Sequence, residues 1–430
     1  MSWPPFAGAC TSTLLLKRLS EGAGMTLHVL EKLAATNPDC EIWWDSSPLV
    51  YDNWARGVLA SAPAGKKADW DAQLKRLFDT ATVAREGTMG FGGVTTNPPL
   101  SLQAIQNDPE FWIGEIGRIA AENPGEDVEG IYWKTYLEVV RRSAEMILPV
   151  YDASNGRHGH LSGQVDPRFV TDYDRMLSQG LQLATIGRNV MVKIPGSAEG
   201  YRVIEELTAR GISTNNTTSF TVPQYIACMD AVSRGLERAR AAGIDLSKWR
   251  SVITHMSARL GNIGDLEAQA DLRGIKLSPE EILHGEMAVM KRAYHHGKRT
   301  GHPSKMLQCS MRVTDEGEGG AASSWHIEKI AGGDFVYTCP PGYIAQLMQA
   351  EDRLPAFDAK AIDEEPPAEV IEKLRQLPYF RQAYDFDGMK PDEFSQFGAF
   401  AATANEFAAA TRKTVDFVAR ALESVRPQAA

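Results

Sequence analysis

The chain has 430 residues, of which 43% are hydrophobic and 23% are charged, a composition typical of a folded globular protein. Its formal net charge of −10 and the lack of a strongly basic run argue against a nucleic-acid partner. No apolar stretch approaches the ~20 residues that a membrane-spanning helix needs, so we expect no membrane insertion.

The cysteine and histidine residues show no pattern typical of a disulfide framework or a metal site. Five cysteines are widely scattered without a CxxC pair, which fits a reducing compartment and predicts a cytoplasmic protein. Nine histidines contain no HExxH motif, and the pairs His158/His160 and His295/His296 lack carboxylates in ligand register. We therefore expect no bound metal.

The start of the chain does not resemble a signal peptide, because it lacks a basic beginning and a long apolar run. The sequence favours an N-terminal extension over residues 1–25, disordered in character. A single domain over residues 26–430, including a C-terminal helix, is expected to follow it.

Short β-rich segments then alternate with longer amphipathic helical patterns. The expected strands are residues 40–45, 91–97, 161–166, 189–195, 211–217, 250–256, 305–311 and 334–340. Strand–helix alternation predicts parallel pairing, and eight such strands close a (β/α)8 TIM barrel. An open doubly wound α/β sheet is the alternative, but no GxGxxG motif follows the first strand.

Several segments are longer than a barrel crossover requires. Residues 101–160 should hold several extra helices, and the acidic, proline-bearing residues 351–370 are typical of a connector. The glycine-rich residues 314–333 could form a lid or a solvated loop. The last helix, ending near residue 425, could lie across the barrel or pack on its side.

The expected fourth strand carries a lysine within an apolar run. Val190, Val192 and Ile194 alternate on one face, and Lys193 lies on the other face. In a closed barrel this ammonium group would be buried, and burial favours the neutral amine. A neutral amine can attack a ketone and form an imine.

Other polar residues also lie at or just after the carboxyl ends of the expected strands, where barrel enzymes place their reactive groups. The whole set comprises Asp45, Asn97, Gln164, Lys193, Asn215, Thr217, Arg259, Ser310 and Arg312. One lysine, one carboxylate, neutral hydrogen-bonding groups and two arginines suit imine chemistry on a phosphorylated carbonyl compound. Taken singly, Asp45 could be a helix N-cap, Asn97 a turn residue, and each arginine an ion-pair partner.

Five motifs together resemble the transaldolase family, most of all its longer bacterial members. They are "GVTTNPPL" (93–100), "VMVKIPGSAEG" (190–200), "GISTNNTTSF" (211–220) followed by Gln224, "CSMR" (309–312) and "CPPGYIAQL" (339–347). The resemblance runs from about residue 40 to residue 425. It implies a (β/α)8 class I aldolase without metal or cofactor, active in carbohydrate metabolism of the pentose phosphate pathway type. Such enzymes transfer a dihydroxyacetone unit from a ketose phosphate, such as fructose 6-phosphate or sedoheptulose 7-phosphate, to an aldose phosphate.

The same resemblance implies roles for the chemical groups. Lys193 would form the Schiff base, and Asp45 would be the acid/base for the C4 hydroxyl of the donor. Thr217 would help orient the catalytic water. Gln164 stands where the family usually has a glutamate, and an amide can hold this water but cannot take up a proton.

The resemblance also implies the binding groups. Asn97 and Asn215 would hydrogen-bond the dihydroxyacetone part of the substrate, while Arg259, Ser310 and Arg312 would bind its phosphate. The implied partners are therefore sugar phosphates, and a homodimer stays open.

Two positions leave the reaction open. Fructose 6-phosphate aldolases are similar in carrying glutamine on strand three, but they pair it with a tyrosine on strand six, where this chain has Met256. Transfer, simple cleavage, and a specialised transaldolase with an unusual acceptor all stay open. A non-catalytic sugar-phosphate-binding protein and a sugar-phosphate isomerase are less well supported, because the set around Lys193 is otherwise complete and Gln164 removes the proton shuttle an isomerase needs.

Overall fold

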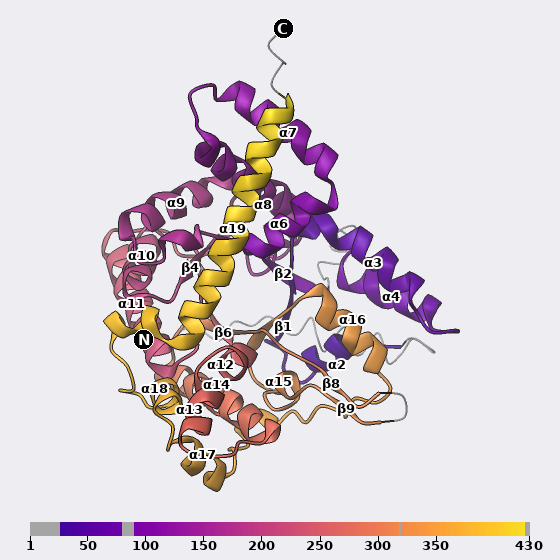
Figure 1. Cartoon of the computed structure of the whole chain (residues 1–430), viewed down its shortest axis with the longest axis vertical. Helices are drawn as coiled ribbons and strands as arrows, with labels where there is room; N and C mark the ends of the chain where they lie inside the picture. Colours follow the sequence, from indigo (N-terminus) through magenta and orange to yellow (C-terminus); the bar gives the residue numbers. More distant parts are fainter. Residues whose placement is uncertain (1–25, 80–89, 318–319, 426–430) are drawn as a thin grey trace.

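The computed structural model describes residues 26–79, 90–317 and 320–425. The extension expected over residues 1–25 lies outside the described residues. Eight parallel strands close into a barrel in the order β1-β10-β7-β6-β5-β4-β3-β2, so the predicted (β/α)8 fold is confirmed. Figure 1 shows the strands enclosed by helices. The barrel strands are β1 Glu41–Asp45, β2 Phe91–Thr95, β3 His160–Gln164, β4 Val190–Pro195, β5 Thr214–Thr217, β6 Ser251–Met256, β7 Lys305–Cys309 and β10 Phe335–Cys339.

Helices surround the barrel and connect its strands. As far as β6 they are α2 Val29–Ala34, η1 Pro48–Val50, α3 Tyr51–Ala60, α4 Lys67–Leu77, α6 Pro98–Asn107, α7 Pro109–Glu122, α8 Val128–Ala153, η2 Pro167–Phe169, α9 Tyr173–Ile186, α10 Ala198–Ala209 and α11 Val222–Ala241. After β6 come α12 Ser257–Asn262, α13 Leu266–Leu272, α14 Pro279–Thr300, α15 Trp325–Glu328, α16 Pro341–Ala350, η3 Ala361–Asp363, α17 Ala368–Leu374, α18 Pro378–Tyr384, η4 Pro391–Gln396 and α19 Gly398–Val425. The extra helices expected over residues 101–160 are therefore confirmed. None of the helices in the described part of the chain has the length and apolar character to cross a membrane.

The glycine-rich segment after β7 is partly regular. β8 Thr314–Asp315 and β9 Ala322–Ser323 pair as a short antiparallel ladder, and α15 follows directly. Arg353, after α16, forms an ion pair with Asp315 and ties this ladder to the connector. Residues 318–319, at the tip of the segment, lie outside the described part.

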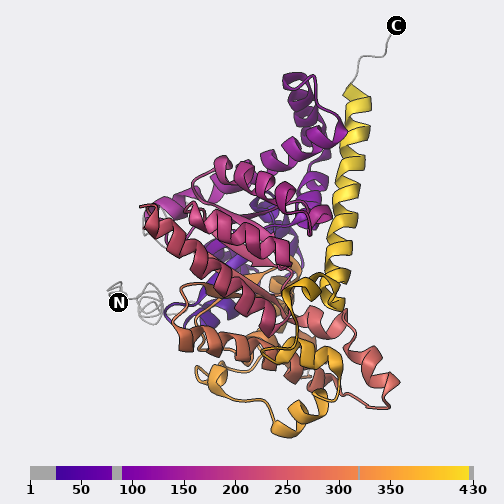
Figure 2. The ribbon, with the colours of Figure 1, turned by 90° about the vertical axis from the view of Figure 1, so that its left-hand side faces the viewer.

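The C-terminal helix α19 runs as one long element along the side of the molecule in Figure 2. It packs against α6, α7, α8 and η2. Because α6 and η2 begin just after the carboxyl ends of β2 and β3, α19 lies across that end of the barrel. Of the two placements that the sequence left open, the structure therefore has the first.

The opposite, amino-terminal end of the barrel is closed by a buried charge cluster. Glu41 at the start of β1 forms ion pairs with Arg250 and Lys305, and it accepts a hydrogen bond from the indole of Trp43 at 3.0 Å. Burial alone would raise the pKa of Glu41, but these cations and His158 hold it well below its usual range. This end of the barrel is therefore filled, and the space for a ligand lies at the other end.

Trp43 packs inside the barrel and does not line the ligand pocket. A Cβ added at Gly93 would lie 2.4 Å from the Trp43 indole, so only glycine on β2 leaves room for this ring. Trp43 and the neighbouring Trp44 are packing residues, since both side chains are fully buried.

Candidate active site

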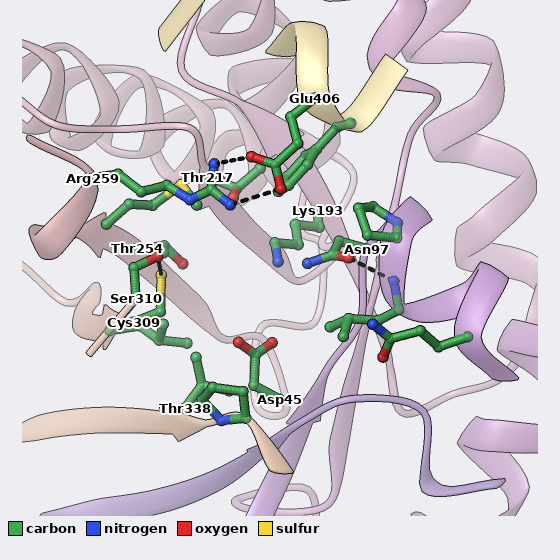
Figure 3. Close-up of a pocket in the computed structure, with 17 residues that line it drawn as sticks. Asp45, Asn97, Lys193, Thr217, Thr254, Arg259, Cys309, Ser310, Thr338 and Glu406 are labelled. Atoms are coloured by element: carbon green, nitrogen blue, oxygen red, sulfur yellow. Dashed lines mark hydrogen bonds and ion pairs between the residues drawn. The ribbon is translucent and has the colours of Figure 1, made fainter. Parts of the chain in front are cut away.

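A pocket of about 270 Å³ opens at the carboxyl ends of the barrel strands (Figure 3). Six of the nine predicted site residues line it: Asp45, Asn97, Lys193, Thr217, Arg259 and Ser310. They come from five different strand ends and from α12, which begins directly after β6. The prediction that these distant segments converge on one mouth is therefore correct for these six residues.

Lys193 lies within β4 and points into the barrel. Its register partners are Gln164 on β3 and Asn215 on β5, and residues paired across parallel strands face the same side of a sheet. The residue is only 5% exposed, and its Nζ donates a hydrogen bond to the backbone carbonyl of Thr96 at 3.1 Å. Burial lowers the pKa of the Lys193 amine, and the nearby Asp45 and Cys309 oppose this effect only in part. The surroundings of Lys193 therefore shift the amine toward its neutral, nucleophilic form.

Asp45 ends β1 and faces the same pocket. Its carboxylate accepts a hydrogen bond from the Thr95 hydroxyl at 2.6 Å. Burial raises the pKa of this carboxyl, although Lys193, the Thr95 hydrogen bond and Arg259 each lower it in part. The alternative of a helix N-cap is wrong for Asp45, because Ser47 caps η1 with its own side chain. Asp45 is therefore a buried, pocket-facing carboxyl suited to taking up and releasing a proton.

Asn97 caps a helix and lines the pocket at the same time. Its side-chain oxygen accepts a hydrogen bond from the backbone nitrogen of Leu100 at 3.0 Å, at the start of α6. Because the oxygen is turned toward the helix, the amide nitrogen points toward Lys193 (Figure 3). Asn97 therefore serves as a helix N-cap, where the sequence had suggested a turn residue, and its amide nitrogen stays available to a ligand.

Two of the predicted residues lie beneath the pocket. Asn215 donates to the Ser162 hydroxyl at 2.9 Å and accepts from the Thr254 hydroxyl at 2.8 Å, so Thr254 forms the pocket wall instead. Gln164 is 2% exposed, and its side-chain oxygen has no hydrogen-bond partner among the described residues. An unpaired buried acceptor beside Lys193 is a position where a water molecule can bind.

The two predicted phosphate-binding arginines are both paired with glutamates. Arg259 on α12 binds Glu406 of α19 through two hydrogen bonds of 2.6 and 3.1 Å. Arg312, three residues after β7, binds the fully buried Glu286 of α14 at 3.1 Å and does not line the pocket. The interpretation of the two arginines as ion-pair partners is therefore confirmed, and their binding of phosphate stays a prediction.

The pocket also contains residues that were not predicted from the sequence. Glu406 and Phe407 come from α19, and Thr254 comes from β6 two residues before Met256, which also lines the pocket. The alternation along β6 could have pointed to Thr254. Nothing local could have placed α19 over the pocket, because that contact joins segments that are far apart in the sequence.

Backbone strain occurs beside the pocket. Ser310, which lines it, has a φ of 57° and lies directly after β7. A non-glycine residue in this left-handed region is unfavourable and must be held there by its surroundings. The strained turn directs the chain from β7 toward Arg312.

We expect the Lys193 amine to react with an aldehyde at lower pH than a lysine in a short peptide does. Folding lowers its pKa, so its neutral form persists at pH values where a free side chain is protonated. Reductive labelling with glycolaldehyde across a pH series, quantified by mass spectrometry of the Lys193 peptide, measures this difference. A profile that coincides with the model peptide, or lies at higher pH, contradicts the prediction.

The fold and the pocket define a class: a closed parallel (β/α)8 barrel with a buried lysine and a carboxyl group at its mouth. The sequence profile described as Transaldolase/Fructose-6-phosphate aldolase matches residues 79–392, well over half of the chain. The chain therefore belongs to the transaldolase/fructose-6-phosphate aldolase family. Asp45 and Glu406 both line the pocket although they lie outside the matched residues.

Individual relatives agree with this membership. The transaldolase of Mycolicibacterium smegmatis is 37% identical over 228 residues, which are 50% of this chain and 60% of that protein. Transaldolase 1 of Streptomyces avermitilis is 38% identical over 199 residues, 46% of this chain and 51% of that protein. The transaldolase of Thiobacillus denitrificans is 28% identical over 314 residues, 69% of this chain and 84% of that protein. The match thus spans about half to three fifths of the first two relatives.

Proposed function

We propose that this protein transfers a dihydroxyacetone unit from a ketose phosphate to an aldose phosphate through an imine on Lys193. The observation that carries the proposal is the buried amine of Lys193, with a depressed pKa, in one pocket with the carboxyl group of Asp45. The relatives named transaldolase support the same reaction type.

The reaction follows from these two groups. The neutral amine adds to the C2 carbonyl of the ketose, and loss of water leaves a protonated imine. The Asp45 carboxylate takes the proton of the C4 hydroxyl, the C3–C4 bond breaks, and its electron pair moves into the imine to form an enamine. The aldose product leaves, and the enamine carbon then attacks the aldehyde of the acceptor. The aldehyde oxygen takes the proton from Asp45 and becomes a hydroxyl group. Water finally hydrolyses the imine.

Gln164 and Thr217 are the groups suited to hold a water molecule in this cycle. Thr217 lines the pocket, and the unpaired side-chain oxygen of Gln164 can accept a hydrogen bond from such a water. The amide of Gln164 does not titrate. Asp45 must therefore carry out the proton transfers that members of the family usually divide between an aspartate and a glutamate. The remaining substrate contacts in the proposal are Asn97 to the dihydroxyacetone part, and Arg259 with Ser310 to the phosphate.

Simple cleavage of fructose 6-phosphate is the second candidate. Gln164 favours simple cleavage, because this chain resembles fructose 6-phosphate aldolases in carrying a glutamine at this position. Met256 weakens it, because this pocket-lining thioether cannot donate the hydrogen bond of a tyrosine.

Borohydride trapping tests the proposal. Reduction in the presence of fructose 6-phosphate is expected to add a covalent mass to Lys193, and erythrose 4-phosphate is expected to accelerate consumption of the donor. The control is reduction without sugar, which should leave the mass unchanged. Trapping without any effect of the acceptor would indicate cleavage in place of transfer, and the absence of an adduct with every ketose phosphate would overturn the imine mechanism.

A further inference from the structure

A carboxylate in the pocket is bound to the arginine that is expected to bind the phosphate of the substrate. Glu406 of α19 lines the pocket and occupies both arms of the Arg259 guanidinium, at 2.6 and 3.1 Å (Figure 3). A two-pronged carboxylate–guanidinium pair uses the same donor geometry that a phosphate needs. A phosphate arriving at Arg259 therefore meets a guanidinium that is already bound.

The second arginine does not compensate for this. Arg312 is bound to Glu286, whose side chain is 0% exposed, and the buried His326 holds the same carboxylate at 2.9 Å. Glu286 is enclosed on all sides and is held by both partners, so its carboxylate has no exposed path into solvent. The charge of Arg312 is thus neutralised by Glu286, and Arg312 does not line the pocket.

Glu406 differs from Glu286 in its freedom to move. Its side chain is 53% exposed, so it can rotate away from Arg259 into water when another anion competes for the guanidinium. After such a movement its negative charge still lies at the rim of the pocket and repels a phosphate dianion. Both effects lower the affinity for a phosphorylated end and leave the affinity for a hydroxyl end unchanged.

We propose that Glu406 is a specificity-determining residue that reduces the preference of this pocket for phosphorylated over unphosphorylated sugars. The inference rests on the proposed function, because it takes the Arg259 end of the pocket as the position of the distal group of the sugar. It concerns binding alone and does not need an imine to form.

The test uses the full chain with Glu406→Gln, which removes the charge and keeps the shape of the side chain. We expect calorimetric titration at low ionic strength to show that inorganic phosphate binds about tenfold more tightly to this variant than to the parent chain. The matched control is Glu423→Gln, which removes the same charge from an exposed position of the same helix, about 25 Å further along at the usual helical rise. It should leave phosphate binding unchanged.

A double-mutant cycle assigns the effect to the pair. Combining Glu406→Gln with Arg259→Gln should remove the gain in phosphate affinity, because the freed guanidinium is then absent. In turnover assays, Glu406→Gln should lower the KM for fructose 6-phosphate and leave the KM for unphosphorylated fructose unchanged.

Three results overturn the proposal. Unchanged phosphate affinity in Glu406→Gln, or no phosphate binding in either chain, means that the carboxylate does not compete. Weaker phosphate binding means that Glu406 instead holds Arg259 in position for the substrate.

A failure of imine trapping with every ketose would overturn the proposed reaction and leave the phosphate titration fully interpretable.

Discussion

Replacing Lys193 by methionine is expected to abolish the borohydride-trapped adduct and to stabilise the fold. Methionine fills a similar volume without an amine, so no imine can form, and turnover should fall by a factor on the order of 10⁵ or more. The side chain is only 5% exposed, and its neighbours in the sequence, Val192 and Ile194, are apolar. A buried thioether is well tolerated at such a site.

The gain in stability follows from the depressed pKa of the amine. Folding lowers the pKa of Lys193, so the unfolded chain binds this proton more tightly than the folded chain does. Protonation therefore favours unfolding at every pH below the unfolded pKa. The methionine chain has no such proton, so its advantage should be complete below the folded pKa and vanish as pH rises above ~10.4, the usual lysine value.

Urea unfolding of both chains at neutral and alkaline pH measures this advantage, and mass spectrometry after borohydride reduction measures the adduct. Lys67→Met, at an exposed position at the start of α4, is the matched control and should keep the adduct. An adduct that persists in Lys193→Met would assign the imine to another lysine. Lower stability of this variant at neutral pH would mean that Asp45 holds the amine in its charged form.

Replacing Asp45 by asparagine is expected to separate imine formation from carbon–carbon cleavage. Asparagine can still accept the 2.6 Å hydrogen bond from Thr95, so the pocket keeps its shape. It cannot take up the proton of the C4 hydroxyl, and cleavage should slow by about 10²- to 10⁴-fold. The amine of Lys193 should still condense with the ketose.

The mass of the trapped adduct distinguishes the two steps. The parent chain with fructose 6-phosphate should yield an adduct of dihydroxyacetone size, while Asp45→Asn should yield one that retains the whole hexose phosphate. Asp52→Asn, at an exposed position on α3, should behave like the parent chain. Cleavage at the parent rate in Asp45→Asn would show that another group is the base, and loss of every adduct would show that Asp45 also assists the condensation.

The local pattern of the chain was sufficient to predict the barrel and the orientation of its lysine. Alternation of apolar residues around Lys193 has a period of two, and this period decides which face of a strand a side chain occupies. Eight such strands, separated by helical patterns, have few ways to pair other than a closed parallel barrel. The same alternation predicted that Lys193 is buried inside the barrel, and it explains why Asn215 and Thr217, two residues apart on β5, share one face.

Depth along the barrel and partners from distant segments depended on the tertiary structure. Asn215 shares a face with Thr217 but lies one layer deeper, beneath the Thr254 hydroxyl. The side chains of Arg259 and Glu406 are separated by 147 positions in the chain, yet they form one ion pair across the pocket. A periodicity describes neighbours within one element, whereas such contacts depend on how whole elements pack. The sequence by itself therefore determined the strands, the inward lysine and the family, and only the folded chain decided which charges meet at the mouth of the barrel.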